Sequence, residues 1–357
     1  MANTMPVFDI KFFTSAIEAI ALAGRGFVAL VVKDATATAK STKTYSNLSQ
    51  VKAGDYDAKN FALLESVFKG NPTKVKVIVA GTAGSFADVS DIVLQGSPDV
   101  DYLVAPDFVA DNTAIISFIT DKRTKGAKLK GVLVATGSDL EYIVNVNITG
   151  AKDDKGTDLP NQEARVAGIL AGLSPTRSAT YFVIPEIATI DDIVDPDKAV
   201  GQGELILFND GRKVKIARGV NSFVSATPEK SLAVFSKIKN VETMDMISYS
   251  LRAVVEDQYV GKYTNNLTNK SLVITALTLF LREMAKQSFL DPSFDNVAMI
   301  DIQKQIEYAL LNGYTQQQID AMNESELKAL NTGDNVYLII NCKLLDTMED
   351  FYIDIHL

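Results

Sequence analysis

The sequence predicts a mixed α/β protein with a β-strand near each end of the chain. In the first half, short runs rich in Val and Ile alternate with segments of helical apolar spacing, which is the pattern of an α/β unit with a mostly parallel sheet. After Pro228, helical spacing dominates. Near both termini, apolar and polar residues alternate, as in strands with one buried face.

The α/β half is expected to consist of short, alternating elements. We expect strands over residues 27–32, 74–80, 101–105, 131–135, 142–148 and 179–184, and helices over 58–68, 85–94, 111–121 and 161–173. Residues 33–45, rich in Ala, Thr and Lys, are expected to form a loop. Asp210-Gly211 lies between the alternating segments 204–208 and 213–218, which predicts a β-hairpin because Gly tolerates the positive φ of a tight turn.

The second half is expected to be helical over residues 242–260, 269–287, 297–311 and 316–330, with strands over 336–344 and 350–357. A further strand is expected directly after Pro6. These elements suggest an N-terminal arm (1–23), an α/β domain (24–225), a C-terminal helical and β domain (226–345) and a C-terminal arm (346–357). The first strand of the α/β domain, at 27–32, could also pack with the C-terminal domain.

The composition excludes several classes of protein. The chain of 357 residues has a formal net charge of −9, one His (His356), one Cys (Cys342) and no Trp. A single Cys and a single His cannot build a disulfide framework or a zinc finger, and His356 is the penultimate residue, a poor place for a catalytic base. An acidic chain without long basic runs does not favour nucleic-acid binding. The N-terminus lacks the pattern of a secretory signal, and no apolar run is long enough to span a bilayer, so we expect a soluble protein made in the cytoplasm.

Two loops have compositions that occur in ligand sites. Residues 81–84 (GTAG) follow an expected strand, a place where phosphate binds in some folds, but they lack the remaining residues of a P-loop or dinucleotide fingerprint, and we interpret them as a tight turn. Asp191, Asp192, Asp195 and Asp197 form an acidic cluster whose spacing does not match a calcium loop, and we interpret it as a solvated loop.

The remaining candidates are interpreted structurally. The densest basic run is expected to be a solvated helix end, or else a patch for an acidic protein surface; its members are Lys122, Arg123, Lys125, Lys128 and Lys130. Residues 218–222 are expected to form a turn after the hairpin. Cys342 is expected to be buried in a strand, and His356 to be a strand residue. Two strands at the ends of a chain usually pair internally, but they are also what a polymerising subunit needs.

Several short motifs, taken in order, resemble the contractile tail sheath family of bacteriophages, and especially the sheaths of diffocin-like bacteriocins and defective prophages of Gram-positive bacteria. The motifs are MPVFDI (5–10), GRGFVAL (24–30), NDG (209–211), KIARGVNS (215–222), GDNVY (333–337) and DTMEDFY (346–352). The resemblance runs from end to end. The chain departs from many phage sheaths in having no room for extra outer domains.

The resemblance implies a compact core whose two arms each add a strand to a neighbouring subunit, so that stacked hexameric rings form around an inner tube and contract when the baseplate triggers them. By position, the N-terminal strand would be Pro6, Val7, Phe8, Asp9, Ile10, Lys11 and Phe12. The C-terminal strand would be Phe351, Tyr352, Ile353, Asp354 and Ile355. The accepting hairpin would include Val336, Tyr337, Leu338, Ile339 and Ile340. The tube contact would lie on residues 316–330, at Gln317, Asp320, Glu324 and Lys328.

The implied partners are other copies of the chain, the inner tube protein, the baseplate and the tail terminator, with no nucleic acid, cofactor, enzymatic activity or membrane insertion. Such a subunit would be made in the bacterial cytoplasm, assembled into a phage tail or bacteriocin and released by lysis. Two other functions stay open at this point: a carboxylate-based, metal-dependent hydrolase using residues 191–197, and a monomeric α/β binding module.

Overall fold

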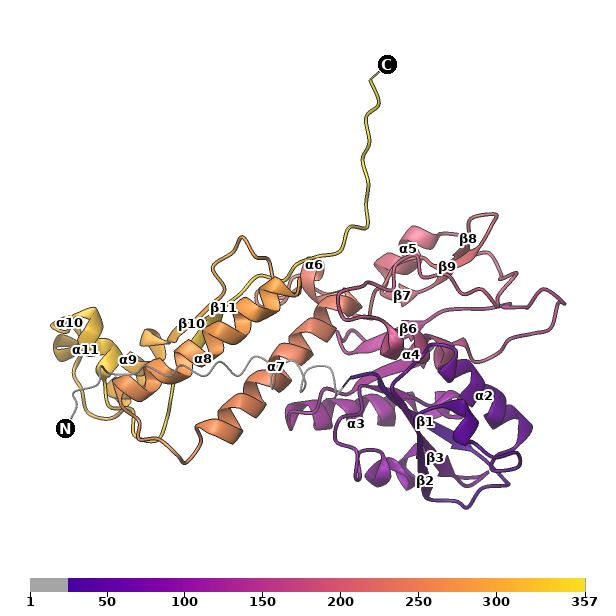
Figure 1. Cartoon of the computed structure of the whole chain (residues 1–357), viewed down its shortest axis with the longest axis horizontal. Coiled ribbons are helices and arrows are strands. Elements are labelled where there is room, and N and C mark those ends of the chain that lie inside the picture. The colour runs from indigo at the N-terminus through magenta and orange to yellow at the C-terminus, as the bar shows by residue number, and fades with distance from the viewer. Residues whose placement is uncertain (1–24, 357) are drawn as a thin grey trace, which may run out of the picture. The chain divides into compact units, whose positions relative to one another are not determined.

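A computed structural model describes residues 25–356 (Figure 1). The described chain divides into two compact units: Ser250–Leu345 forms one, and residues 25–249 together with 346–356 form the other. The division falls inside α7 (Ile238–Gln258), later in the chain than the boundary expected at residue 225. The unit of residues 25–249 and 346–356 is called the α/β unit below, and Ser250–Leu345 is called the helical unit.

A seven-stranded sheet forms the centre of the α/β unit, in the order β2-β3-β1-β4-β5-β6-β7. Adjacent strands are parallel except β2, which pairs antiparallel with β3 at one edge. The bounds are β1 Phe27–Lys33, β2 Ser41–Tyr45, β3 Lys74–Ala80, β4 Tyr102–Val104, β5 Lys130–Val134, β6 Ile143–Val146 and β7 Glu204–Leu205. The run FVALVV of β1 is buried throughout because both faces of the sheet are covered.

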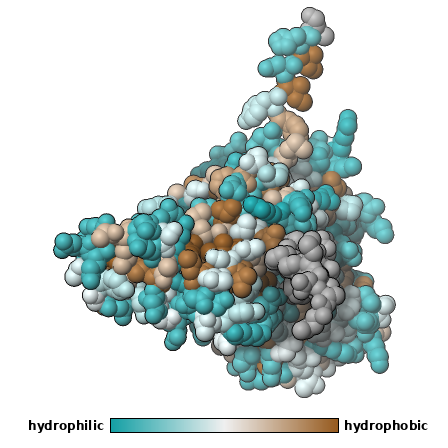
Figure 2. Space-filling view, turned by 60° about the vertical axis from the view of Figure 1, so that its left-hand side comes forward, coloured by the Kyte–Doolittle hydropathy of each residue, from teal (hydrophilic) through white to brown (hydrophobic). Residues whose placement is uncertain are grey.

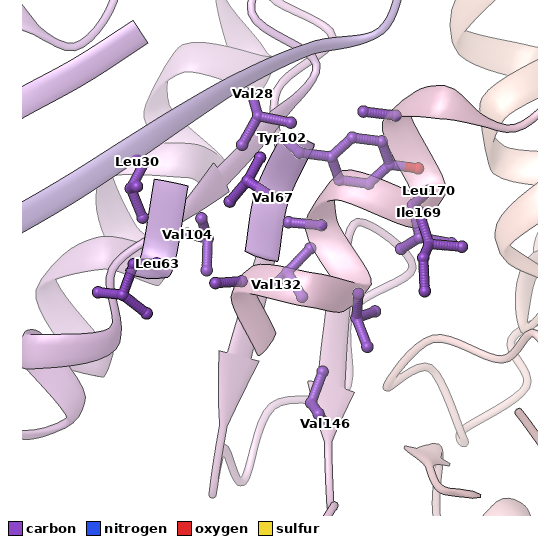
Figure 3. Close-up of a cluster of buried hydrophobic side chains, with 14 of the residues drawn as sticks. Val28, Leu30, Leu63, Val67, Tyr102, Val104, Val132, Val146, Ile169 and Leu170 are labelled. Carbon is purple, nitrogen blue, oxygen red and sulfur yellow. The ribbon is translucent and has the colours of Figure 1, made fainter. Parts of the chain in front are cut away.

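The alternation of side chains in β1 divides the apolar core into two layers. Val28 and Leu30 pack toward α2 (Ala58–Phe68) and α4 (Gln162–Gly172), among the residues that Figure 3 shows. Ala29 and Val31 belong to the opposite layer, with the buried residues of α3 (Asn112–Thr124). The expected α/β class is therefore confirmed, with helices on both faces of the sheet.

Glycine permits the close packing of α2 on α4. A Cβ atom added at Gly168 would lie 2.1 Å from the Val67 carbonyl oxygen, and one added at Gly70 would lie 2.0 Å from the Gly168 carbonyl carbon. Any larger residue at either position would separate the two helices.

The hairpin expected around Asp210-Gly211 is confirmed. β8 (Leu207–Asn209) pairs antiparallel with β9 (Val214–Ile216), and Gly211 has φ +83° in the turn. The α/β unit also contains α5 (Pro196–Gly201), α6 (Leu232–Phe235) and the short 3₁₀ turns η1 (Leu48–Gln50) and η4 (Pro106–Asp111).

The helical unit contains the last part of α7, the long helix α8 (Leu267–Lys286) and a two-stranded antiparallel ribbon. The ribbon consists of β10 (Val297–Ile300) and β11 (Leu338–Asn341), and β10 packs against α8. Three short helices lie between the strands in sequence: α9 (Ile302–Leu311), α10 (Gln316–Asp320) and α11 (Glu324–Ala329). Among residues 25–356, no helix combines the length and the apolar character that a membrane span requires.

Three expectations for the α/β unit are wrong. Residues 41–45, expected in a loop, form β2 because this polar segment pairs with the edge of β3. Residues 85–94 form two 3₁₀ turns, η2 (Phe86–Asp88) and η3 (Ser90–Ile92), since the Asp88 carboxylate accepts from the Ser85 amide and closes the first turn. Residues 179–184 are not a strand: Tyr181 has φ +59°, and one isolated bridge joins Val183 to Lys215.

Three expectations for the C-terminal part are also wrong. Residues 297–311 are not one helix, because the apolar run 297–300 pairs as β10 and Asp301 caps a helix that begins at Ile302. Residues 316–330 form two helices, since the Asn323 side chain accepts from the Glu326 amide and starts a second one. Residues 351–356 lie in no strand within the described chain.

The basic run was expected to be solvated, but three of its five members, Arg123, Lys128 and Lys130, are largely covered and form ion pairs. Lys130 lies inside the α/β unit, with Nζ 3.0 Å from the Glu242 and 3.0 Å from the Asp245 carboxylates of α7. Arg123 forms a bidentate pair with Asp245, at 2.6 and 3.0 Å. The reason is that α7 packs on the sheet and brings the Asp245 carboxylate next to Arg123 and Lys130, although it is more than one hundred residues away from them in the sequence.

Glu242 is the centre of this buried charge cluster. Its carboxylate accepts from Arg25 (2.7 Å), from Lys130 and from the Tyr102 hydroxyl. Nearby, Lys128 pairs with Asp101 at 2.9 Å, and Asp101 accepts from the Phe27 amide at the start of β1. Burial alone would raise the pKa of Glu242, but Lys130 and Arg25 outweigh that effect and hold the pKa below its usual range.

Replacing Glu242 with Ala should destabilise the protein strongly. Lys130 and Arg25 would stay buried without their shared counter-charge, and breaking a buried pair in this way costs about 3–5 kcal/mol. Guanidinium unfolding followed by circular dichroism measures the change in free energy. The control is Glu256→Ala on the same helix, where the carboxylate is exposed and pairs with the exposed Arg252; it should change the free energy by about 1 kcal/mol or less. Equal effects of the two substitutions would contradict the assigned role of Glu242.

Candidate functional site: a C-terminal arm and a two-stranded ribbon

The C-terminal arm begins with a short segment, residues 346–350, that is attached to the α/β unit by its acidic side chains. We call this segment the arm root. Its three carboxylates each contact a cation: Asp346 contacts Lys237, and the adjacent Glu349 and Asp350 contact Arg218 in the loop after β9.

Arg218 is the main cation at the arm root. Its Nη2 lies 2.5 Å from Asp350 Oδ1, and its Nε lies 3.5 Å from Glu349 Oε2. Thr180 joins the same group: its hydroxyl donates to Glu349 Oε1 at 2.9 Å and accepts from the Gly219 amide at 3.0 Å. The turn expected at residues 218–222 is therefore also the attachment point of the arm, which the sequence did not indicate.

Asp346, the first residue of the arm root, is held by two side chains from the start of α7 and the residue before it. Lys237 Nζ lies 3.0 Å from Asp346 Oδ1, and the Asn240 side-chain amide donates to the same oxygen at 3.1 Å. Desolvation acts to raise the pKa of Asp346, but the hydrogen bonds from Lys237 and Asn240 outweigh it and lower that pKa below 3.8. Asp346 is thus charged at neutral pH, and the arm root stays attached there.

Beyond Asp350 the chain is extended and uncovered. Figure 1 shows the last residues as an extended trace, and Figure 2 shows their apolar and polar side chains projecting into solvent. Phe351 is 69% exposed, Ile353 76% and Ile355 79%, whereas a globular surface seldom leaves such a contiguous set of large apolar residues open. In an extended segment these three lie on one face and Tyr352, Asp354 and His356 on the other. Residues 351–355 are called the free arm below.

The ribbon of the helical unit has one buried and one exposed face. Ala298 and Ile300 of β10 are buried, whereas Met299 of β10 and Ile339 of β11 are exposed. The register pairs Ala298 with Ile340 and Ile300 with Leu338, so these four residues form the inner face.

The outer edge of β11 is open. The Asp301 amide donates to the Tyr337 carbonyl, which identifies 301 and 337 as a hydrogen-bonded pair of the ladder. Because hydrogen-bonded and non-hydrogen-bonded pairs alternate, Leu338 and Ile340 point their backbone N–H and C=O groups away from β10. The outer edge of β10 is partly closed, since the Ala298 amide donates to the Thr278 hydroxyl of α8 at 3.1 Å. The described residues thus leave β11 as an edge to which another strand can add.

The structure places the other predicted residues as follows. The N-terminal strand, Pro6–Phe12 by sequence, lies outside the described residues. The residues proposed to contact the tube lie on α10 and α11, where Gln317, Asp320 and Glu324 are exposed and Lys328 pairs with Glu324 at 2.6 Å. Cys342 was expected to be buried, but it is exposed, because β11 ends at Asn341 and the ribbon has only two strands.

Side chains in or beside the two loops considered as ligand sites are engaged in capping neighbouring helical turns. Asp195 caps α5 by accepting from the Lys198 amide, and Ser85, directly after residues 81–84, caps η2. Within residues 25–356, no group of three or more His, Cys, Asp or Glu side chains is arranged to hold a metal ion. These loops therefore offer no support for the hydrolase interpretation.

Solved structures with the same fold include a sheath tail protein and a chain of a prophage baseplate. A sheath tail protein from Listeria innocua is 19% identical and matches with a TM-score of 0.65, over 81% of this chain and 92% of that chain. The protein in a structure of the anti-feeding prophage baseplate is 10% identical and matches with a TM-score of 0.66, over 100% of this chain and 99% of that chain. The chain thus shares its fold with both of these proteins.

Sequence relatives show the family. The phage tail sheath C-terminal domain matches residues 231–357. The tail sheath protein of Clostridium phage phiCD119 is 32% identical over 359 residues, covering 98% of both chains. The phage-like element PBSX protein XkdK of Bacillus subtilis is 31% identical over 134 residues, covering 36% of this chain and 28% of that protein. The chain belongs to the phage tail sheath family, and it is a tail sheath protein.

Replacing Arg218 with Met should loosen the arm root without unfolding the core. The substitution keeps the apolar stem and removes the contacts to Glu349 and Asp350. Partly exposed pairs contribute up to about 1 kcal/mol, so amide exchange at residues 346–350 should accelerate by roughly fivefold. Hydrogen–deuterium exchange with mass spectrometry measures it. Arg212→Met, in the exposed β8–β9 turn, is the control and should leave these amides unchanged. Unchanged exchange in both variants would show that Arg218 does not hold the root.

Proposed function

We propose that this sheath protein polymerises by strand exchange: the free arm, and the N-terminal strand Pro6–Phe12, each add to the ribbon of a neighbouring copy. The single observation that carries the proposal is the coexistence, in one chain, of an exposed alternating segment and an open strand edge. Pairing through the main chain supplies affinity, and the alternation of side chains fixes the register.

The free arm and the open edge of the ribbon are different surfaces, so the contact between copies is heterologous. Two copies joined in this way still have an unused arm and an unused edge, and the contact does not end at a dimer. Repetition of such a contact gives rings and helical tubes. The proposed assembly is a sheath of stacked hexameric rings around an inner tube. Self-assembly of this kind is consistent with the structural match to a protein solved as a sheath complex in the contracted state, at 11% identity and a TM-score of 0.64.

We propose that the sheath assembles in an extended, higher-energy state and contracts when the baseplate triggers it, driving the tube into the target envelope. The exchanged strands keep copies linked while their α/β units rotate as rigid bodies into a packing of lower free energy. The proposed partners are other copies of the chain, the inner tube protein, the baseplate and the tail terminator. The subunit would be made in the bacterial cytoplasm, with the particle released by lysis.

The particle is proposed to be either a complete phage tail or a phage-tail-like bacteriocin of the diffocin type. Electron microscopy of lysates distinguishes the two, because phage tails carry capsids and bacteriocins do not.

Deleting residues 351–357 should block polymerisation and leave the monomer folded. Residues 351–356 are exposed and lie after the last root contact at Asp350, so no described core packing is lost. We expect the full chain to form tubes or rings in negative-stain images and to sediment as large species. The truncated chain should sediment as a monomer with an unchanged circular dichroism spectrum. As a matched pair, Ile353→Asp should behave like the truncation, whereas Asp354→Ser on the opposite face should assemble normally. Tubes formed by the truncated chain would refute strand exchange by this arm.

The tube contact is proposed to lie on the exposed polar surface of α10 and α11, at Gln317, Asp320, Glu324 and Lys328. A charged surface binds the tube and still releases it during contraction, which a large apolar patch would hinder. The double variant Asp320→Lys with Glu324→Lys should form empty sheaths but lose co-sedimentation with the tube protein, with the greatest difference at low salt. Glu256→Lys together with Asp257→Lys, near the end of α7, serves as the charge-matched control. Normal co-sedimentation of the first variant would place the tube contact elsewhere.

A further inference from the structure

Residues 301–337 form a small helical lobe between the two strands of the ribbon, in which α9, α10 and α11 lie together (Figure 1). The buried apolar residues shared by the three helices are Ala309, Ile319 and Leu330. So small an apolar core holds the helices together but fixes their angles weakly, because apolar contacts are not directional. Hydrogen bonds, which are directional, are needed to fix the orientation of α11, the helix that carries Glu324 and Lys328.

A lysine of α8 is buried against this lobe. Lys270 is 3% exposed, and its Nζ donates to Gln305 Oε1 of α9 at 2.5 Å and to the Leu330 carbonyl oxygen, directly after α11, at 3.2 Å. Both of these acceptors are uncharged, and burial lowers the pKa of the Lys270 ammonium. Burying a charge among neutral partners costs free energy, and an apolar side chain would fill the same space without that cost. The lysine is therefore better explained by the hydrogen bonds that it makes than by packing.

Gln305 extends this contact to α11. Its side chain is fully buried, and its Nε2 donates to the carbonyl oxygens of Leu327 at 2.8 Å and Lys328 at 3.2 Å. The last turn of a helix has carbonyl groups that need donors from elsewhere, and here a side chain of α9 supplies them. One end of the Gln305 amide faces Lys270 and the other faces α11, so a single hydrogen-bonded link joins α8, α9 and α11. We call it the Lys270–Gln305 link.

The chain that leaves α11 is held in a similar way. Asn265, in the loop between α7 and α8, donates from Nδ2 to the Gly333 carbonyl at 2.7 Å and to the Asn335 carbonyl at 2.9 Å. The first turn of α11 is capped by its own Asn323, and the Glu324 side chain there is 71% exposed. The helix is thus anchored at its C-terminal end and open at its N-terminal end.

We propose that Lys270 and Gln305 are positioning residues for the tube contact: neither touches the tube, but together they hold α11 at the angle that presents its charged side chains. This inference rests on the tube contact proposed above and adds the residues that orient that surface. A buried polar link permits one orientation where an apolar contact of the same size would permit several. A surface oriented in advance binds its partner more tightly, because less conformational freedom is lost on binding.

The substitution Gln305→Glu separates positioning from stability. The new carboxylate still accepts from Lys270 and gives it a counter-charge, so the melting temperature should stay the same or rise. The same carboxylate has no donor for the carbonyl groups of α11 and repels them. Amide exchange over residues 324–330 should therefore accelerate by about tenfold, and the apparent Kd for the tube protein in co-sedimentation should rise by about tenfold. Sheath formation by the variant alone should be normal.

Two further variants complete the test. Gln258→Glu adds the same charge at an exposed position near the end of α7 and should change neither amide exchange nor tube binding. Lys270→Met removes the ammonium and leaves the Gln305 amide on α11, so it should change both quantities in the same direction as Gln305→Glu, by a smaller factor. If Gln305→Glu does not fold, the measurements on Lys270→Met decide the question.

The outcomes separate this inference from the function on which it rests. Unchanged amide exchange over residues 324–330 in both Gln305→Glu and Lys270→Met would overturn it. Faster exchange with normal tube binding would also overturn it when the Asp320→Lys, Glu324→Lys variant no longer binds the tube, because the contact would then stand without needing a fixed α11. If that charge-reversed variant binds the tube normally, the proposed tube contact fails, and the inference fails with it.

Discussion

The α/β unit depends on the charge cluster that fixes the first part of α7 to its sheet. Glu242 and Asp245 bring two carboxylates into an interior where Lys130, Arg123 and Arg25 supply the opposite charge. Buried pairs of this kind often add little net stability, but they are intolerant of a missing partner and so permit one arrangement of the helix. The same helix continues into the helical unit, so the residue at which the two units divide lies within a continuous stretch of backbone hydrogen bonds.

Much of the fold follows from local sequence. The helix over Ala58–Phe68 and the strand over Lys74–Ala80 have the predicted bounds, because an Asp57 cap, a glycine-proline stop and an unbroken Val-rich run each act within a few residues. Elements that depend on distant partners were predicted less well. The polar strand β2 exists because β3 offers an edge, and VAMI at 297–300 is a strand because β11 lies beside it. Apolar spacing alone does not distinguish that run from the start of a helix.

The candidate site also contains one part that local sequence predicts and another that depends on distant partners. The alternation of the free arm is visible in the sequence, whereas the exposure of its large apolar side chains is seen only in the structure. The arm root could not be predicted, because Arg218 and Asp350 are 132 residues apart and neither belongs to a pattern that indicates pairing. For the basic run, the dense cluster of charges led to a prediction of solvent exposure. In the fold, Arg123 and Lys130 are instead covered and paired with acidic side chains of α7.

The arm root and the free arm meet without a linker. Asp350 is the last residue held by Arg218, and Phe351 is the first residue of the segment proposed to pair with a neighbour. In the proposed assembly, no flexible chain would lie between the α/β unit and the shared strand, so a rotation of the unit would be transmitted directly to that strand. The number of residues between the arm root and the shared strand, and not only the affinity of the strand pairing, would then determine how directly a rotation of one copy is transmitted to the next. Inserting flexible residues at this single peptide bond would leave every contact intact and still uncouple neighbouring subunits mechanically.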